Sequence, residues 1–121
     1  MHKKNRILIK IGGRAFADQD GFRELEHAIK LVDADVALVH GGGSEISQAL
    51  QDAGREFVFV DGVRATNAKD IEIVERVLSE TINSRIAEYL SEFGVACTRL
   101  SGKSQSLLIA HKILRNGRDI G

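Results

Sequence analysis

Three consecutive glycines, Gly41–Gly43, follow a short apolar run and precede a segment with helix-forming residues. A turn needs only one or two glycines. Three of them remove side chains at the C-terminal end of a predicted strand, where open α/β sheets place their ligands. Bare backbone there allows close approach, and the N–H groups of a loop and a helix start attract anions. The alternative is a purely structural role for the glycines, in a tight strand-to-helix turn that binds no ligand.

Lys10 is the second candidate, because it lies in the otherwise apolar run Ile7–Ile11, directly before Gly12 and Gly13. A cation at the end of a first strand, beside two glycines, is well placed to meet phosphate oxygens. An edge-strand lysine that extends into solvent is the alternative. Neither G-x-x-x-x-G-K-[ST] nor G-x-G-x-x-G occurs, so the known phosphate-loop motifs do not explain these glycines.

Arg64 follows a predicted hairpin turn, and an arginine fork can donate two parallel hydrogen bonds to a carboxylate. An exposed hairpin arginine is the alternative. The loop Ser101–Ser104 is a weaker anion-binding candidate, and we interpret His40 as a hydrogen-bonded histidine at a strand end rather than a base. Asp70 is a carboxylate without an evident partner. No H-E-x-x-H or G-x-S-x-G motif is present, and we predict no metal site.

The elements that must position these residues alternate between two hydrophobic periods. Apolar runs predict buried strands at 7–11 and 36–39. Between them, the apolar residues within 22–32 recur at helical spacing and predict a helix. Asp18, which precedes them, is a plausible N-cap. Ser44 is the expected N-cap of a second helix. Strand–helix–strand order implies parallel pairing with right-handed crossovers.

Asp61-Gly62 between the β-formers 57–60 and 63–66 predicts a β-hairpin. A long helix should follow from Asn67 to about Phe93. Its apolar stripe is predicted to be Ile71, Val74, Leu78, Ile82, Ile86 and Leu90. After it we expect a fourth strand over Val95–Leu100 and a fifth over Leu107–Leu114. The predicted fold class is α/β, a mainly parallel sheet with helices on both faces and a β-hairpin.

Composition restricts the function classes. The chain has 121 residues, 43% hydrophobic and 28% charged, as in an ordinary globular domain. Acidic and basic residues balance at 17 each and aromatics are only 5%, which argues against a nucleic-acid partner. The single Cys97 excludes an internal disulfide and fits a reducing compartment. The apolar run after the basic N-terminus is too short for a signal peptide or membrane span, so we expect a cytoplasmic protein.

Taken in order, the motifs resemble those of the amino-acid kinase family, and most closely those of its acetylglutamate kinases. They are I-K-I-G-G at 9–13, V-H-G-G-G at 39–43 and D-G-V-R-A-T at 61–66, extended by R-L-S-G-K at 99–103 and L-I-A-H-K at 108–112. Each motif is weak alone, but their order and separation are specific. Such enzymes phosphorylate the side-chain carboxylate of N-acetyl-L-glutamate in arginine biosynthesis, with MgATP as co-substrate.

The resemblance implies a role for each matched residue. Lys10 matches the catalytic lysine that stabilises the phosphoryl group in transit, and Arg64 matches the arginine that binds the α-carboxylate of the substrate. The matched glycines are Gly12, Gly13 and Gly41 for the phosphates, and Gly42 and Gly43 for the acetylglutamate. The helix from Asn67 resembles one that the family uses in a homodimer interface, which implies a homodimer or a higher homo-oligomer.

Two departures qualify the resemblance. Proline commonly follows the glycines, whereas Ser44 stands here, and Glu45 would repel an anionic substrate if it faced the site. Family members are more than twice as long, and their nucleotide-binding half cannot be located. We therefore expect residues 1–121 to be an N-terminal substrate-binding part, inactive alone. The alternatives are a non-catalytic amino-acid-sensing domain, or a kinase for aminoadipate or glutamate.

Overall fold

The computed structural model describes residues 3–12 and 19–121, and the chain forms two compact units. Unit 1 comprises Met1–Gly42 and Asn83–Arg99, and unit 2 comprises Gly43–Ile82 and Leu100–Gly121. The chain therefore passes from one unit to the other inside the glycine triplet. Each unit is described by itself. Among the described residues, no helix has the length and apolar character needed to cross a membrane.

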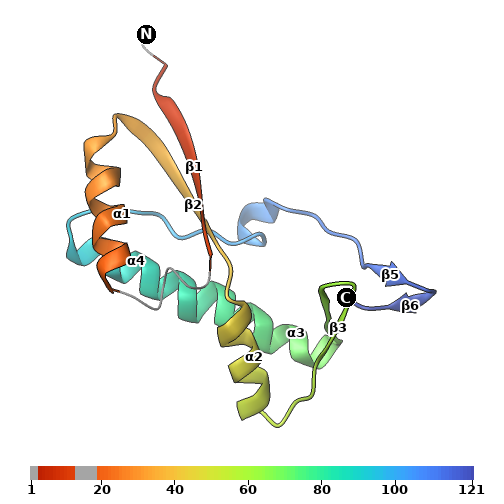
Figure 1. Cartoon of the computed structure of the whole chain (residues 1–121). Coiled ribbons are helices and arrows are strands. Elements are labelled where there is room, and N and C mark those ends of the chain that lie inside the picture. Colours follow the sequence, from red (N-terminus) through yellow and green to blue (C-terminus); the bar gives the residue numbers. More distant parts are fainter. Residues whose placement is uncertain (1–2, 13–18) are drawn as a thin grey trace. The chain divides into compact units, whose positions relative to one another are not determined.

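Unit 1 is built on two parallel strands, β1 (Asn5–Ile11) and β2 (Ala34–His40). Both runs are rich in aliphatic residues that suit a pleated strand. They lie side by side in Figure 1, with Ile7 paired with Val36 and Ile11 with His40. The predicted parallel pairing is confirmed, and with it the α/β class.

Two helices complete unit 1: α1 (Gln19–Leu31) and α4 (Asn83–Glu92). Phe22 of α1 is buried, and its ring centroid lies 4.8 Å from that of Tyr89 of α4. Ile86 and Leu90, one helical turn apart on α4, are buried with it. The predicted N-cap Asp18 and the predicted phosphate-binding Gly13 lie outside the described residues.

Unit 2 begins with α2 (Gly43–Asp52), which buries Ile46 and Leu50. The prediction that Ser44 is its N-cap was wrong. The helix starts one residue earlier, and the Ser44 hydroxyl donates to the Glu45 carboxylate at 2.8 Å. Gly42 precedes the first helical residue, and glycine is an acceptable residue at that position.

The predicted hairpin is confirmed, as β3 (Val58–Val60) paired antiparallel with β4 (Val63–Ala65). Its turn residues Asp61 and Gly62 have φ of 50° and 77°. Two positive φ values in a two-residue loop are the signature of the turn type that Asp-Gly favours. Because this loop sets the register, Phe59 lies directly opposite Arg64.

The predicted long helix begins as expected: α3 (Ala68–Glu75) follows Asn67, whose side chain accepts from the N–H groups of Lys69 and Asp70. A π-helical stretch, Arg76–Ile82, comes next in the sequence and α4 follows it. The predicted stripe was wrong at Ile71, which is 50% exposed, whereas Val74 and Leu78 are half-buried and Val77, outside the stripe, is buried. Val77 and Ile82 are five residues apart, the spacing that brings side chains to one face of a π-helix.

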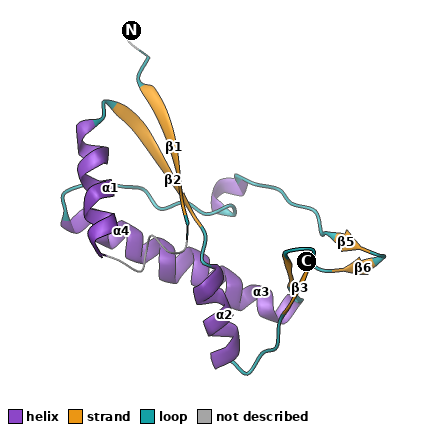
Figure 2. Cartoon of the chain, viewed as in Figure 1, coloured by secondary structure: helices purple, strands orange, loops and turns teal. Residues whose placement is uncertain are grey.

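The predicted fourth strand was wrong: Val95–Leu100 is loop, as Figure 2 shows. Of the predicted fifth strand only its end is extended, in β5 (Leu114–Arg115), which pairs antiparallel with β6 (Arg118–Asp119). Apolar content predicts a strand only where a neighbouring strand offers hydrogen bonds. Within the described chain these residues have no ladder partner, and Leu108 and Ile109 are 72% and 86% exposed.

Candidate functional site

The predicted site residues divide between the two units. Those in unit 1 are Lys10, Gly12, Gly41 and Gly42, and those in unit 2 are Gly43 and Arg64. Each group depends on a different local structure. The first group sits at the common end of two parallel strands, and the second joins a helix start to a hairpin.

In unit 1, the register of β1 and β2 aligns the ends of the two strands. Ile11 pairs with His40, so Gly12 and Gly41 are the next residue on each strand. Lys10 pairs with Val39 and is exposed. It has no ion pair or hydrogen bond to another described side chain. The structure therefore brings Lys10 and these two glycines to one edge, the C-terminal edge at which parallel sheets bind ligands.

His40 makes polar contacts through both ring nitrogens at this edge. Arg99 Nε, which can only donate, lies 3.0 Å from Asn83 Oδ1, and this leaves Asn83 Nδ2 to donate to His40 Nε2 at 3.2 Å. The other ring nitrogen, Nδ1, therefore carries the proton and lies 3.0 Å from the Gly41 carbonyl oxygen. The interpretation of His40 as a hydrogen-bonded strand-end residue is confirmed, and the ring orients the start of the glycine turn.

Packing within unit 1 does not explain why Gly12 and Gly41 are glycines. No described atom of the unit would lie within 4 Å of a Cβ at either position. Neither residue has the left-handed φ that favours glycine. Among the described residues, nothing lies against the backbone of either glycine.

In unit 2, Arg64 is fixed by neighbours from two elements. Its Nη2 donates to the Gly43 carbonyl oxygen at 3.1 Å and to Ser47 Oγ at 2.7 Å, both on α2. Its Cζ lies over the rings of Phe57 and Phe59, 4.5 and 4.7 Å from their centroids. Such cation–π contacts hold a guanidinium more strongly as water is excluded. The side chain is half-buried and held in one orientation, unlike an exposed hairpin arginine.

One nitrogen of this guanidinium has no acceptor among the residues that the structure describes. Nη1 of Arg64 is buried and, in the part of the chain that the structure describes, has no hydrogen-bond partner. A buried donor left without an acceptor costs about 1–3 kcal/mol. An oxygen that reached Nη1 would remove this cost, and an anionic oxygen would also pair with the positive charge.

Asp70 is a polar residue whose role sequence reasoning missed. It is 3% exposed and accepts from Arg55 Nε at 2.6 Å and from Asn67 Nδ2 at 2.7 Å. The signal was the Asn-x-x-Asp spacing at a helix start, a variant of the capping box. Asp70 anchors the segment that follows β4, so it is a structural carboxylate of the Arg64 hairpin.

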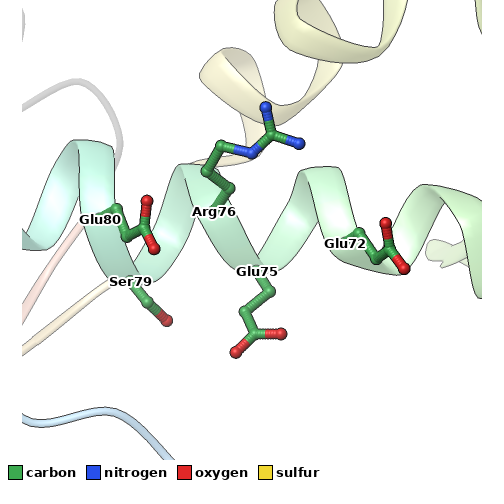
Figure 3. Close-up of a pocket in the computed structure, with 5 residues that line it drawn as sticks. All are labelled: Glu72, Glu75, Arg76, Ser79 and Glu80. Carbon is green, nitrogen blue, oxygen red and sulfur yellow. The ribbon is translucent and has the colours of Figure 1, made fainter.

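Two other features of unit 2 lack the geometry of a site. A shallow depression of about 290 Å³ on α3 and the π-helical stretch is lined by Glu72, Glu75, Arg76, Ser79 and Glu80 (Figure 3). Its side chains fan out from one helical ribbon rather than converging on a point. The described residues contain no group of three or more His, Cys, Asp or Glu side chains arranged to hold a metal ion.

The loop Ser101–Ser104 was the weaker anion-binding candidate. The Ser101 N–H donates to Ser104 Oγ at 2.9 Å, and the Ser104 N–H donates to the Ser101 carbonyl oxygen at 3.0 Å. The Lys103 ammonium pairs with Glu75 at 2.6 Å. These donors are already used within the unit, so the loop does not present them to an anion.

Comparison with known proteins gives consistent matches. Acetylglutamate kinases of Rhizorhabdus wittichii and Paraburkholderia phymatum are 36% and 35% identical to the chain over 116 residues. Those alignments cover 93% of this chain but only 38% and 39% of the two kinases. The chain thus spans well under half the length of these curated relatives.

A solved structure supports the fold. The crystal structure of smu.665 from Streptococcus mutans UA159 matches with a TM-score of 0.64 and 26% sequence identity, over 80% of this chain and 40% of that one. The model of the amino acid kinase family matches residues 5–119, nearly the whole sequence. This chain belongs to the amino acid kinase family.

Proposed function

We propose that the chain is the N-terminal, substrate-binding part of an acetylglutamate kinase. In this proposal the enzyme transfers the γ-phosphoryl group of MgATP to the side-chain carboxylate of N-acetyl-L-glutamate, and residues outside 1–121 bind the nucleotide. The chain alone is then inactive. Its likeness to relatives of that name supports the proposal, as does their greater length. The same likeness is our ground for proposing a cytoplasmic homo-oligomer.

The observation that carries the proposal is the state of Arg64. Its guanidinium is fixed against two aromatic rings and the first turn of α2, and one buried nitrogen has no acceptor among residues 3–12 and 19–121. We propose that the α-carboxylate of the substrate supplies that acceptor at Nη1. The Gly43 carbonyl already accepts from the same guanidinium, which places the arginine at the start of the glycine-preceded helix.

We propose that the strand edge of unit 1 handles the phosphoryl group. Lys10 would neutralise charge on the transferring group, with Gly12, Gly13 and Gly41 leaving backbone room for its oxygens and Gly42 and Gly43 for the substrate. Phosphoryl transfer is catalysed mainly by positioning and charge neutralisation, so a cation and bare backbone are the parts it requires. The exposed Lys10 and the open space beside Gly12 and Gly41 support these roles.

Calorimetric titration of the chain with N-acetyl-L-glutamate tests the substrate assignment. L-Glutamate and 2-aminoadipate are the control ligands, and circular dichroism verifies that the sample is folded. We expect binding of the acetylated ligand and at least tenfold weaker binding of the two controls. No binding by a folded chain would contradict the proposal, and preferential binding of a control would favour a kinase for that amino acid.

Lys10→Ala tests the catalytic role. In a chimera in which residues 1–121 replace the matching part of the Rhizorhabdus wittichii kinase, we expect kcat to fall about 10²- to 10³-fold, the loss typical of removing one transition-state contact. The KM for N-acetyl-L-glutamate should change little. Lys4→Ala is the matched control. Lys4 directly precedes β1, at the opposite end of the strand from Lys10, and pairs with Asp35.

An unchanged kcat in Lys10→Ala would remove that role. If the unmutated chimera bound N-acetyl-L-glutamate but transferred no phosphoryl group, the chain would be a non-catalytic amino-acid-binding domain.

A further inference from the structure

Ser47 stands at the centre of the contacts that orient Arg64. It lies on α2, where its Oγ donates to the Gly43 carbonyl oxygen at 2.9 Å and accepts from Arg64 Nη2 at 2.7 Å. Arg64 Nη2 also donates to the same carbonyl at 3.1 Å. The three groups therefore form a closed ring of hydrogen bonds in which Ser47 is both donor and acceptor.

This ring occupies both protons of one guanidinium nitrogen. Nη2 carries two protons and has two acceptors, Gly43 O and Ser47 Oγ. Nη1 carries two protons and has no acceptor among the described residues. Nη1 is therefore the guanidinium nitrogen with hydrogen-bonding capacity left, and because it is buried, a ligand oxygen reaches it only when the atoms that cover it move aside.

The aromatic neighbours restrain Arg64 in a different way. Cζ lies over the rings of Phe57 and Phe59, which are themselves nearly perpendicular, with an interplanar angle of 86°. The attraction of a cation to a ring face limits how far the guanidinium moves away, but it sets no direction within the guanidinium plane. Only a directional hydrogen bond selects which nitrogen is held and which is left open.

We infer that Ser47 is a positioning residue for substrate binding, acting through Arg64. The inference rests on the proposed function, since it takes an acidic amino-acid substrate as the ligand of Nη1. The hydroxyl fixes Nη2 against the first turn of α2, so that Nη1 is presented to a carboxylate oxygen. Without the hydroxyl, Nη2 keeps only the longer bond to the Gly43 carbonyl, so the guanidinium is held less firmly and Nη1 keeps its position only part of the time.

The test compares three variants of the full chain by calorimetric titration with N-acetyl-L-glutamate. Ser47→Ala removes the hydroxyl, Ser47→Thr retains it, and Ser44→Ala removes a nearby hydroxyl that contacts Glu45 instead. We expect about tenfold weaker binding for Ser47→Ala, the loss of one hydrogen bond to a charged group. Ser47→Thr and Ser44→Ala should stay within about twofold of the unmutated chain.

Folding is a separate variable and is measured separately. Alanine is a better helix former than serine, which offsets only part of the lost hydrogen bonds, so thermal unfolding must show that Ser47→Ala is folded at the titration temperature. Equal affinity of Ser47→Ala and the unmutated chain would overturn the inference.

A second readout does not depend on the ligand. In NMR spectra of the guanidinium nitrogens, the hydrogen-bonded Nη2 of Arg64 should give a signal distinct from that of Nη1, because its rotation is slowed. We expect these signals to merge in Ser47→Ala and to remain separate in Ser47→Thr. If the unmutated chain does not bind N-acetyl-L-glutamate, the proposed function fails while this spectrum still decides the role of Ser47. Unchanged signals in Ser47→Ala would overturn the inference whatever the ligand.

Discussion

Two hairpins of unit 2 share the same turn chemistry and differ in nearly everything else. Both are two-residue loops with an Asx-Gly sequence, Asp61-Gly62 and Asn116-Gly117. All four residues have positive φ, between 50° and 77°. Each hairpin also carries an arginine on a strand next to the turn. Their local sequences therefore predict the same structure and the same exposure.

The two hairpins differ in the residue that lies opposite the arginine on the neighbouring strand. In the first hairpin Arg64 lies opposite Phe59, an aromatic surface for its cation. In the second, Arg115 lies opposite Arg118, and two like charges directly opposite destabilise a strand pair. Arg115 Nε is 3.9 Å from a carboxylate oxygen of Asp61, both side chains being largely exposed. Such a pair contributes little.

The difference shows that a turn sets the register, while the neighbours decide whether an arginine is held or solvated. The side chain of Arg64 on β4 reaches α2, where the Gly43 carbonyl and the Ser47 hydroxyl accept from it. All residues of β5 and β6 are exposed. The buried Ile120 follows β6, and its carbonyl accepts from the Thr66 N–H at 3.0 Å. The second hairpin thus meets the first through this backbone hydrogen bond and the exposed Arg115–Asp61 pair, and its own strands stay exposed.

The largest expected effect comes from removing each arginine. Arg64→Ala should weaken binding of N-acetyl-L-glutamate by about 2–5 kcal/mol, because it removes the partner of a desolvated carboxylate. Arg115→Ala is the matched control and should leave the affinity unchanged. Titration calorimetry measures both. Equal affinity of Arg64→Ala and the unmutated chain would erase the functional contrast between the hairpins.

An intermediate effect is expected from the turn glycines. Ala at Gly62 or Gly117 must adopt a left-handed φ, which costs about 1–2 kcal/mol. Gly62→Ala should lower the free energy of unfolding by this amount, since its hairpin packs into the unit. Gly117→Ala should lower it less, because an exposed hairpin relieves strain by opening locally. Urea unfolding measures both, and equal losses would show that the second hairpin is as firmly built as the first.

The smallest effect concerns pH at the exposed hairpin. The hydrogen bond from Lys112 and the Gly121 N–H lower the pKa of Asp119 below its usual 3.8, and Asp119 raises the pKa of Lys112 above its usual 10.5. A lowered carboxyl pKa stabilises the hairpin above pH 3.8, and this is lost as pH falls through the folded value. The lysine contribution is present below pH 10.5 and is lost as pH rises through its raised value.

Lys112→Gln tests this pair. By NMR titration of the Asp119 carboxyl carbon, its midpoint should move up toward 3.8, whereas Lys69→Gln, on the exposed start of α3, should not move it. Added salt should shrink the shift, as for any solvent-exposed pair. A midpoint unchanged in Lys112→Gln would show that the pair does not form.

Local patterns were sufficient for part of the fold. The parallel strands of unit 1 followed from aliphatic runs separated by a helical period, and the first hairpin followed from Asp61-Gly62. The same turn signal at Asn116-Gly117 was present in the sequence and was missed, because the apolar residues before it favoured a single long strand. The hairpin depends on contacts between residues close in the sequence. The parallel pair depends on a short crossover through α1.

The other predictions were wrong because interactions between segments distant in the sequence decided the structure there. The stripe from Ile71 assumed 3.6 residues per turn, and the π-helical stretch shifted the buried position to Val77. Val95–Leu100 has strand-forming residues but no partner among the described strands. Neither outcome could be derived from local propensity, because both depend on which backbone lies alongside.

The sequence by itself determined the residue types at the candidate site: a lysine before glycines, a glycine triplet and an arginine next to a tight turn. The two-residue turn also determined that Phe59 lies opposite Arg64, since register follows from loop length. Only the tertiary structure decided that Ser47 accepts from Nη2 and that Nη1 is buried with no acceptor in the described part of the chain. Those facts depend on where the folded chain brings Arg64 beside α2, and hydrogen bonds between elements distant in sequence exist only once the chain has folded.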